Sequence, residues 1–201
     1  MSKFNTTICR FFLVALVCLA VQTVPRVSGQ NVTNMSVDDE RKLITLLKSP
    51  DFSRSSKEHI DAVINLSELA RKGWLRLPES IKTIAENIDI DVNSRSTGIR
   101  DSNGIEIVVT SHTHLEPPEK TFPAISALIA IGESALPAIL DVIVNNDTDS
   151  IQSGNAMYVL TQHFRGAPEK SREFLLQASR HADSDKAKTR LAAALDKIDG
   201  H

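Results

Sequence analysis

Apolar residues recur at helical spacing along most of the chain, and this period constrains the fold more than any other feature. Ile81, Ile84, Ala85 and Ile88 stand at i, i+3, i+4 and i+7, which is the spacing of one face of an α-helix. The same period returns near the end of the chain, in residues 187–198. A chain patterned in this way must bury one stripe of each helix against other helices, so a mainly α-helical fold is predicted.

The helical segments and their starts can be placed from this period and from capping residues. Ser36 is expected to cap the first helix, where Asp38, Asp39 and Glu40 suit the positive N-terminal end. Ser134 is expected to cap a later helix in the same way. The segments predicted to be helical are 36–49, 55–72, 78–88, 122–131, 134–145, 150–164, 169–180 and 184–198.

Residues 89–121 interrupt the helical pattern. Apolar and polar residues alternate over 88–93 and again over 105–109, and Asn103-Gly104 stands before the second run. Asn-Gly between alternating runs is a strong short-range signal for a β-hairpin. We therefore predict a small extended or β-hairpin insertion near 89–121.

The second half of the chain contains an internal repeat. The pair Ala124 and Leu128 reappears 32 residues later as Ala156 and Leu160. The glycines expected to stop the first helix of each copy are Gly132 and Gly166. A helical unit of this kind cannot bury its own apolar face, so its copies must stack on each other. Leu128 and Leu160 are then expected to be fully buried, and the alternative is two unrelated helical hairpins.

The run of residues 127–140, ALIAIGESALPAIL, resembles the HEAT-type helical repeat, and the resemblance extends over about 122–198. The next copy departs from the family pattern, because Ala167-Pro168 replaces Ala-Leu-Pro. The resemblance implies stacked helical hairpins with a curved surface that binds other proteins. Such repeats also occur as rigid attachments to enzymes, so the resemblance does not exclude an enzymatic partner domain.

Residues 1–29 have the pattern of a secretory signal peptide. Lys3 and Arg10 supply a positive start, and an uninterrupted apolar run of eleven residues follows over 11–21. A lasting membrane span needs about 20 such residues, so this run is expected to direct export rather than to anchor the chain. Cleavage after Gly29 or after Ala20 fits the small residues found there. The protein is therefore expected to be extracytoplasmic, either periplasmic or secreted.

Cleavage after residue 29 would change which function classes remain open. Both cysteines, Cys9 and Cys18, lie in the removed segment, so thiol catalysis and thiolate metal sites are excluded for the mature chain. The mature chain would hold 20 basic and 25 acidic residues. Nucleic-acid binding requires clustered Lys and Arg, and no such cluster is present in the sequence, so a nucleic-acid partner is not expected.

Asp89, Asp91 and Asn93 form one candidate metal site. Their spacing matches the first three ligands of an EF-hand calcium loop. The rest of the loop does not fit, because Ser94 stands where the turn needs glycine and Arg100 where a bidentate glutamate belongs. The alternative interpretation is an edge strand whose polar residues face water.

A second candidate site consists of His112 and His114, with Glu116 close by. Residues i and i+2 of a strand lie on the same side, so both rings could reach one zinc ion. No third ligand pattern follows, and the other histidines, His59, His163 and His181, fall on separate predicted helices. If the insertion is only a surface element, replacing Asp89, Asp91, His112 and His114 by alanine should leave folding nearly unchanged.

Other chemistry finds little support in the sequence. Gly132-Glu133-Ser134 begins like a Gly-x-Ser-x-Gly nucleophile motif, but Leu136 occupies the last glycine position. No phosphate loop, dinucleotide fingerprint or acid–base pair is found in the sequence. Glycosylation sequons stand at Asn31, Asn34, Asn65 and Asn146.

These observations predict a mainly α protein of stacked antiparallel helical hairpins, a HEAT-like α-solenoid, with a small extended or β-hairpin insertion near 89–121. The expected parts are a signal peptide (1–29), a linker (30–35), an N-terminal helical region with the insertion (36–121) and HEAT-like repeats (122–201). The expected function is a non-catalytic protein-interaction or structural module, with another protein as partner, no cofactor and no lasting membrane insertion. The alternative is a calcium- or zinc-dependent module, or an enzyme accessory, with its site in 89–121.

Overall fold

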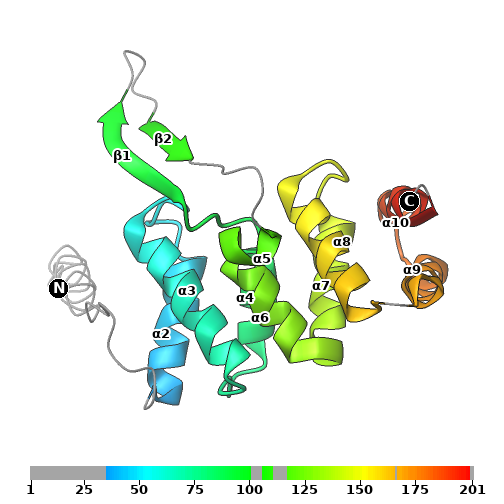
Figure 1. Ribbon diagram of the computed structural model, residues 1–201, viewed down its shortest axis with the longest axis horizontal. Coiled ribbons are helices and arrows are strands. Elements are labelled where there is room, and N and C mark those ends of the chain that lie inside the picture. Colours follow the sequence, from blue (N-terminus) through cyan, green and yellow to red (C-terminus); the bar gives the residue numbers. More distant parts are fainter. Residues whose placement is uncertain (1–34, 101–105, 111–116, 166, 200–201) are drawn as a thin grey trace, which may run out of the picture. The chain divides into compact units, whose positions relative to one another are not determined.

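The computed structural model describes residues 35–100, 106–110, 117–165 and 167–199, and this part of the chain is mainly α-helical (Figure 1). The predicted signal peptide, residues 1–29, lies outside the described residues. The elements are α2 (Val37–Lys48), α3 (Lys57–Arg71), α4 (Glu79–Glu86), β1 (Ser94–Arg100), β2 (Glu106–Thr110), α5 (Pro118–Thr121), α6 (Pro123–Ile131), a 3₁₀ turn (Gly132–Ala135), α7 (Leu136–Asn145), α8 (Ile151–His163), α9 (Pro168–His181) and α10 (Asp185–Asp199).

Helix α2 begins and ends where its sequence predicts. The Ser36 hydroxyl accepts the Asp39 backbone N–H at 3.2 Å, and the Asp39 carboxylate accepts the Ser36 backbone N–H at 3.2 Å. This reciprocal pair is a capping box, and hydrogen bonds from Ser36 lower the pKa of the Asp39 carboxyl. The helix stops at Lys48, since Ser49 precedes Pro50 and adopts an extended conformation.

Helix α3 ends at a glycine whose backbone conformation is difficult for other residues. Gly73 has φ of +69°, in the left-handed region. Its N–H donates to the Ala70 carbonyl at 2.9 Å, and the Trp74 N–H donates to the Leu69 carbonyl at 2.9 Å. These two bonds form a Schellman motif, which satisfies carbonyls that the helix leaves without partners.

Helices α6 and α7 are separated by Gly132, as the predicted glycine stop requires. Gly132 has φ of +72°, and the 3₁₀ turn that it opens leads directly into α7. The prediction that Ser134 caps the second helix is wrong, because Ser134 lies within the turn. Ala135 occupies the N-cap position and provides no side-chain hydrogen bond.

The alternating residues 88–93 do not form a strand, which corrects the sequence interpretation. Ile88 and Ile90 are both buried, 0% and 7% exposed, in the turns that follow α4. The first strand, β1, starts only at Ser94 and pairs antiparallel with β2. The register pairs Ser94 with Thr110 and Arg100 with Glu106, with an irregularity between them. The predicted Asn103-Gly104 turn lies outside the described residues.

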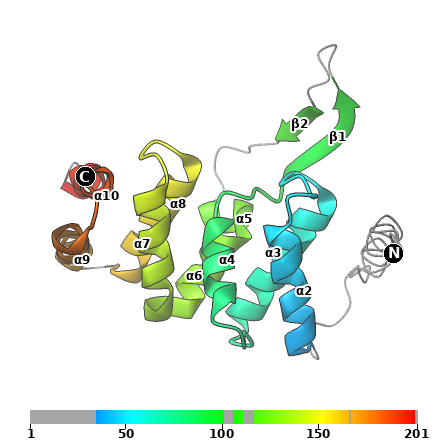
Figure 2. The same cartoon turned by 180° about the vertical axis from the view of Figure 1, so that it is seen from behind.

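The helices pack in an order that follows the chain (Figure 1, Figure 2). Helix α2 contacts α3 and α4; α3 contacts α6, and α6 contacts α8. A second series runs from α4 to α7 and from α7 to α10. Helix α9, expected to pair with α8, packs mainly against α10 instead. Within α9 only Ser171 and Leu175 are buried.

One apolar core joins these helices. Leu128 on α6 and Leu160 on α8 are 1% and 0% exposed, which confirms the prediction that both are fully buried. The largest core side chains that are also fully buried are Leu66, Ile84, Ile88, Ile125, Ile139, Ile143, Leu175, Leu191 and Val63. Each buried leucine or isoleucine contributes about 1.5–3 kcal/mol relative to an exposed one.

The last helix is fixed to the turn between α7 and α8. The Arg190 guanidinium, on α10, donates to the Val144 carbonyl at 2.7 Å and to the Asp147 carboxylate at 2.6 Å. Lys197 donates to the Thr148 carbonyl at 2.6 Å. Because the final carbonyls of α7 have no partner within the helix, Arg190 completes the C-terminus of α7 from a distant part of the chain.

The segment Pro123–Asn145, which comprises α6, the 3₁₀ turn and α7, is long and apolar enough to cross a membrane by length and composition alone. Its mean hydropathy is 2.0, and 44% of its most apolar window is buried inside the protein. A core helix passes the same test. Here the segment is divided at Gly132 and supplies Ile125, Leu128 and Ile139 to the core.

Candidate functional site: the polar junction at the end of α4

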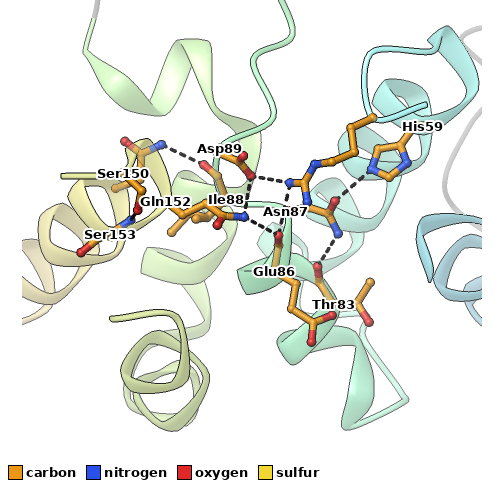
Figure 3. Close-up of polar contacts among 11 residues, drawn as sticks. His59, Thr83, Glu86, Asn87, Ile88, Asp89, Ser150, Gln152 and Ser153 are labelled. Atoms are coloured by element: carbon orange, nitrogen blue, oxygen red, sulfur yellow. Dashed lines mark hydrogen bonds and ion pairs between the residues drawn. The ribbon is translucent and has the colours of Figure 1, made fainter. Parts of the chain in front are cut away.

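The sequence-predicted residue Asp89 lies in a network of polar side chains at the C-terminal end of α4 (Figure 3). We call this network the α4 junction; its side chains come from Arg54, His59, Asn87, Asp89, Gln152 and Asn155. The Asp89 Oδ1 atom accepts from Arg54 at 2.5 Å and from the Gln152 side-chain amide at 3.1 Å. The carboxylate that was a candidate calcium ligand is therefore already paired with a cation and an amide of this chain.

The junction also completes the backbone at the end of α4. The Glu86 carbonyl accepts from Arg54 at 3.3 Å and from Gln152 at 3.2 Å. The Ile88 carbonyl accepts from the Asn155 side-chain amide at 2.9 Å. The last carbonyls of a helix have no partner within the helix. Side chains from before α3 and from α8 thus serve as the C-terminal cap of α4.

His59 and Asn87 form the buried half of the junction. His59 is 2% exposed and Asn87 is 4% exposed. The Asn87 amide nitrogen donates to the Thr83 carbonyl at 2.9 Å, which leaves its Oδ1 atom to face the His59 Nε2 atom at 2.9 Å. Because an amide oxygen can only accept, Nε2 carries the proton and donates.

The environment of His59 favours the neutral ring. Burial lowers the pKa of His59 below its ordinary value of 6.5, and the positive charge of Arg54 lowers it further. The hydrogen bond to Asn87 and the charge of Asp89 oppose this shift without cancelling it. The other ring nitrogen, Nδ1, is buried and has no hydrogen-bond partner among the described residues.

Asp91 and Asn93, the other members of the calcium candidate, belong to the turn that leads into β1. Asp91 is 7% exposed, and its Oδ1 atom accepts the Asn93 backbone N–H at 2.7 Å. This is a local side-chain turn of the type that Asp favours. Neither carboxylate is a free surface group, because Asp89 is paired with Arg54 and Gln152 and Asp91 is buried in the turn.

The histidine candidate cannot be placed, since His112, His114 and Glu116 lie outside the described residues. His163 packs edge-on against Phe164, with ring centroids 4.7 Å apart. The exposed His181 lies 2.8 Å from the Gln177 carbonyl through its Nδ1 atom. Within the described ranges, no three His, Cys, Asp or Glu side chains gather as a metal site would require.

Glu40 is a buried carboxylate that stabilises the fold, a role that the sequence interpretation missed. It was assigned with Asp38 and Asp39 to the helix dipole, yet it is only 2% exposed. Its carboxylate accepts the backbone N–H of Arg76 at 3.1 Å and that of Leu77 at 3.2 Å. The Ser80 hydroxyl also donates to it. Glu40 shares the i, i+4, i+7 stripe of α2 with Ile44 and Leu47, a signal that was present in the sequence.

Tyr158 and Glu119 form a separate contact between α8 and α5. The Tyr158 hydroxyl donates to the Glu119 carboxylate at 2.6 Å. This hydrogen bond, with burial as the next cause, raises the pKa of Tyr158 to about 12. The phenol therefore stays protonated at neutral pH, and the pair fastens α5 to α8 rather than supplying a base.

Two of the sequons lie in the described part of the chain. Asn65 lies within α3, followed by the fully buried Leu66 and Ser67. The Asn146 amide donates to the Val142 carbonyl at 2.9 Å and so closes the C-terminus of α7. Attaching a glycan to either nitrogen would disturb a helix, while Asn31 and Asn34 lie outside the described residues.

Comparison with family models, with curated proteins and with solved structures gives no match to this chain. The donors and acceptors of the α4 junction are paired with one another, except for the Nδ1 atom of the buried His59 ring. Such an arrangement holds helices in register.

Proposed function

We propose that this chain is an exported, non-catalytic helical-repeat protein that acts as a protein-interaction or structural module, with a HEAT-like α-solenoid architecture and the β1–β2 pair as an extended insertion. The observation that supports the proposal most is the order of helix packing. One series of contacts runs α3–α6–α8 and another runs α4–α7–α10. Stacking of helical hairpins in two layers would produce the α3–α6–α8 and α4–α7 contacts, with α10 rather than α9 in the next position beside α7.

The polar contacts support the same proposal. Arg54 reaches the end of α4 from the loop before α3, and Gln152 and Asn155 reach it from α8. A module that presents a fixed surface needs such cross-links, because each unit contacts only its neighbours and cannot hold its position alone. A repeat protein would then offer the exposed residues of one layer to its partner.

Site-specific photo-crosslinking tests the interaction proposal. A photoreactive amino acid is placed at exposed positions of the α3–α6–α8 series, namely Glu58, Ala130 and Thr161, or of the α4–α7–α10 series, namely Lys82, Asp141 and Lys188. We expect adducts with one protein partner from successive positions of one series. Equal crosslinking from both series, or none from either, would contradict a surface formed by one layer.

The export proposal has its own test. N-terminal sequencing of material from the extracytoplasmic fraction should begin at Gln30, or at Val21 if cleavage follows Ala20. Exported protein that still contains Phe11 would contradict cleavage of this segment. Chelator treatment serves as a control for the metal-dependent alternative, because a module without a metal site keeps its melting temperature when EDTA is added.

A further inference from the structure

His59 is placed where a second proton on its ring has no acceptor. The residue lies in the first turn of α3, and its backbone N–H is bound by the Ser56 hydroxyl at 3.2 Å. The ring is 2% exposed, and its Nε2–H donates to the Asn87 side-chain oxygen. The buried Nδ1 atom has no partner among the described residues. Protonation would therefore create a buried, unpaired N–H together with a positive charge.

The charges around the ring do not compensate for that proton. Arg54, which precedes α3, disfavours it, whereas Asp89, which follows α4, favours it. Asp89 is itself paired with Arg54 at 2.5 Å, so much of its charge is already neutralised. The N-terminus of α3 adds a positive partial charge. Helix α6, which packs on α3, carries no titratable residue over Pro123–Ile131.

Helices α2 and α4 also pack against α3, and neither places a second anion beside the ring. Helix α2 contributes Glu40, which is bound at the opposite end of α4. The ionisable side chains of α4 are all exposed to solvent; they are Glu79, Lys82 and Glu86. An imidazolium at position 59 would therefore have no acceptor for its Nδ1 proton among the described residues.

We infer that His59 is an acid-sensitive latch, which holds the start of α3 against the end of α4 while its ring is neutral and releases that end, with the turn that leads into β1, when the ring takes up a proton. Release follows from geometry. For the charged ring to reach water, His59 must separate from Asn87, and Asn87 is also bound to Thr83 in the last turns of α4. The freed segment is residues 87–93.

The direction of the pH effect follows from proton binding. A histidine whose folded-state pKa is depressed is neutral in both states above the unfolded value of about 6.5, so the fold is then at full stability. As the pH falls below that value the unfolded or opened state binds the proton first. The opening equilibrium therefore rises, approaching tenfold per pH unit until the folded ring also titrates.

Measurements on the full-length chain test this latch between about pH 7.5 and about pH 5.5, above the range in which most carboxylates titrate. Hydrogen exchange, corrected for intrinsic rates, should show opening of residues 87–93 increasing on acidification, with the amides of α9 and α10 unaffected. His59→Gln should abolish this increase, because glutamine can still donate to Asn87 but cannot be protonated. His181→Gln, at an exposed position, is the matched control and should behave like the unmodified chain.

A second measurement keeps the inference testable if His59→Gln does not fold. Ring NMR signals of the unmodified chain report the titration of His59 directly. We expect its midpoint below the ordinary histidine value of about 6.5. A midpoint at or above that value would overturn the latch, as would acid-induced opening that is the same in the His59→Gln variant or is spread evenly over the chain.

Discussion

The two ends of helix α4 are held by different chemistry. At the N-terminal end a single buried carboxylate, Glu40 of α2, accepts from the backbone of Arg76 and Leu77. At the C-terminal end several polar side chains of the α4 junction form the hydrogen bonds, and two of them donate to the same carbonyl of Glu86. The N-terminal end depends on one carboxylate. At the C-terminal end, one side chain can be lost while another still binds the same carbonyl. The two ends should therefore respond differently to single substitutions.

The largest effect is expected at the N-terminal end. Replacing Glu40 by alanine leaves two backbone N–H groups without their acceptor and removes a buried side chain, so the free energy of unfolding should fall by about 3 kcal/mol. Chemical denaturation measures this loss. Glu40→Gln keeps one acceptor oxygen and should lose less. Asp38→Asn, in the same turn but exposed, should stay within about 0.5 kcal/mol of the unmodified chain.

A smaller loss is expected for the buried half of the junction. Asn87→Ala leaves the His59 Nε2–H and the Thr83 carbonyl without their partner. Burying unpaired polar groups costs about 1–3 kcal/mol, and we expect about 2 kcal/mol by denaturation. A loss as large as that of Glu40→Ala would show that the C-terminal end also depends mainly on one residue.

The exposed half of the junction should show the smallest single effects. Arg54→Ala and Gln152→Ala should each cost about 0.5 kcal/mol, because each leaves the other bound to the Glu86 carbonyl and to Asp89. The double variant should cost more than the sum, since it removes both partners at once. Additive losses in a double-mutant cycle would disprove the redundancy.

Helix positions could be predicted from the sequence because their signals are local. Ser36 lies three residues from the Asp39 that it caps, and Ser49-Pro50 ends the helix through the chain itself. The internal repeat also predicted correctly that Leu128 and Leu160 are buried. For the helix ends, the residues that decide the outcome stand within a few positions of one another.

The residues of the candidate site could not be predicted in the same way. Asp89 is bound by Arg54 and Gln152, which stand 35 and 63 residues away in the chain. Its alternation with apolar residues predicted a strand, but burial of Ile88 and Ile90 against the helices prevailed over that pattern. Glu40 was misread because its acceptor role depends on backbone groups 36 and 37 residues later.

The contact of Arg190 with the end of α7 has a consequence for the growing chain. Val144 and Arg190 are separated by 46 residues, so a chain elongated only to residue 165 already contains α2 to α8 but not the donor that completes α7. Synthesis at about 5–20 residues per second leaves this helix end open for some seconds. During that interval the apolar residues of α7 lack the partner that α10 later supplies.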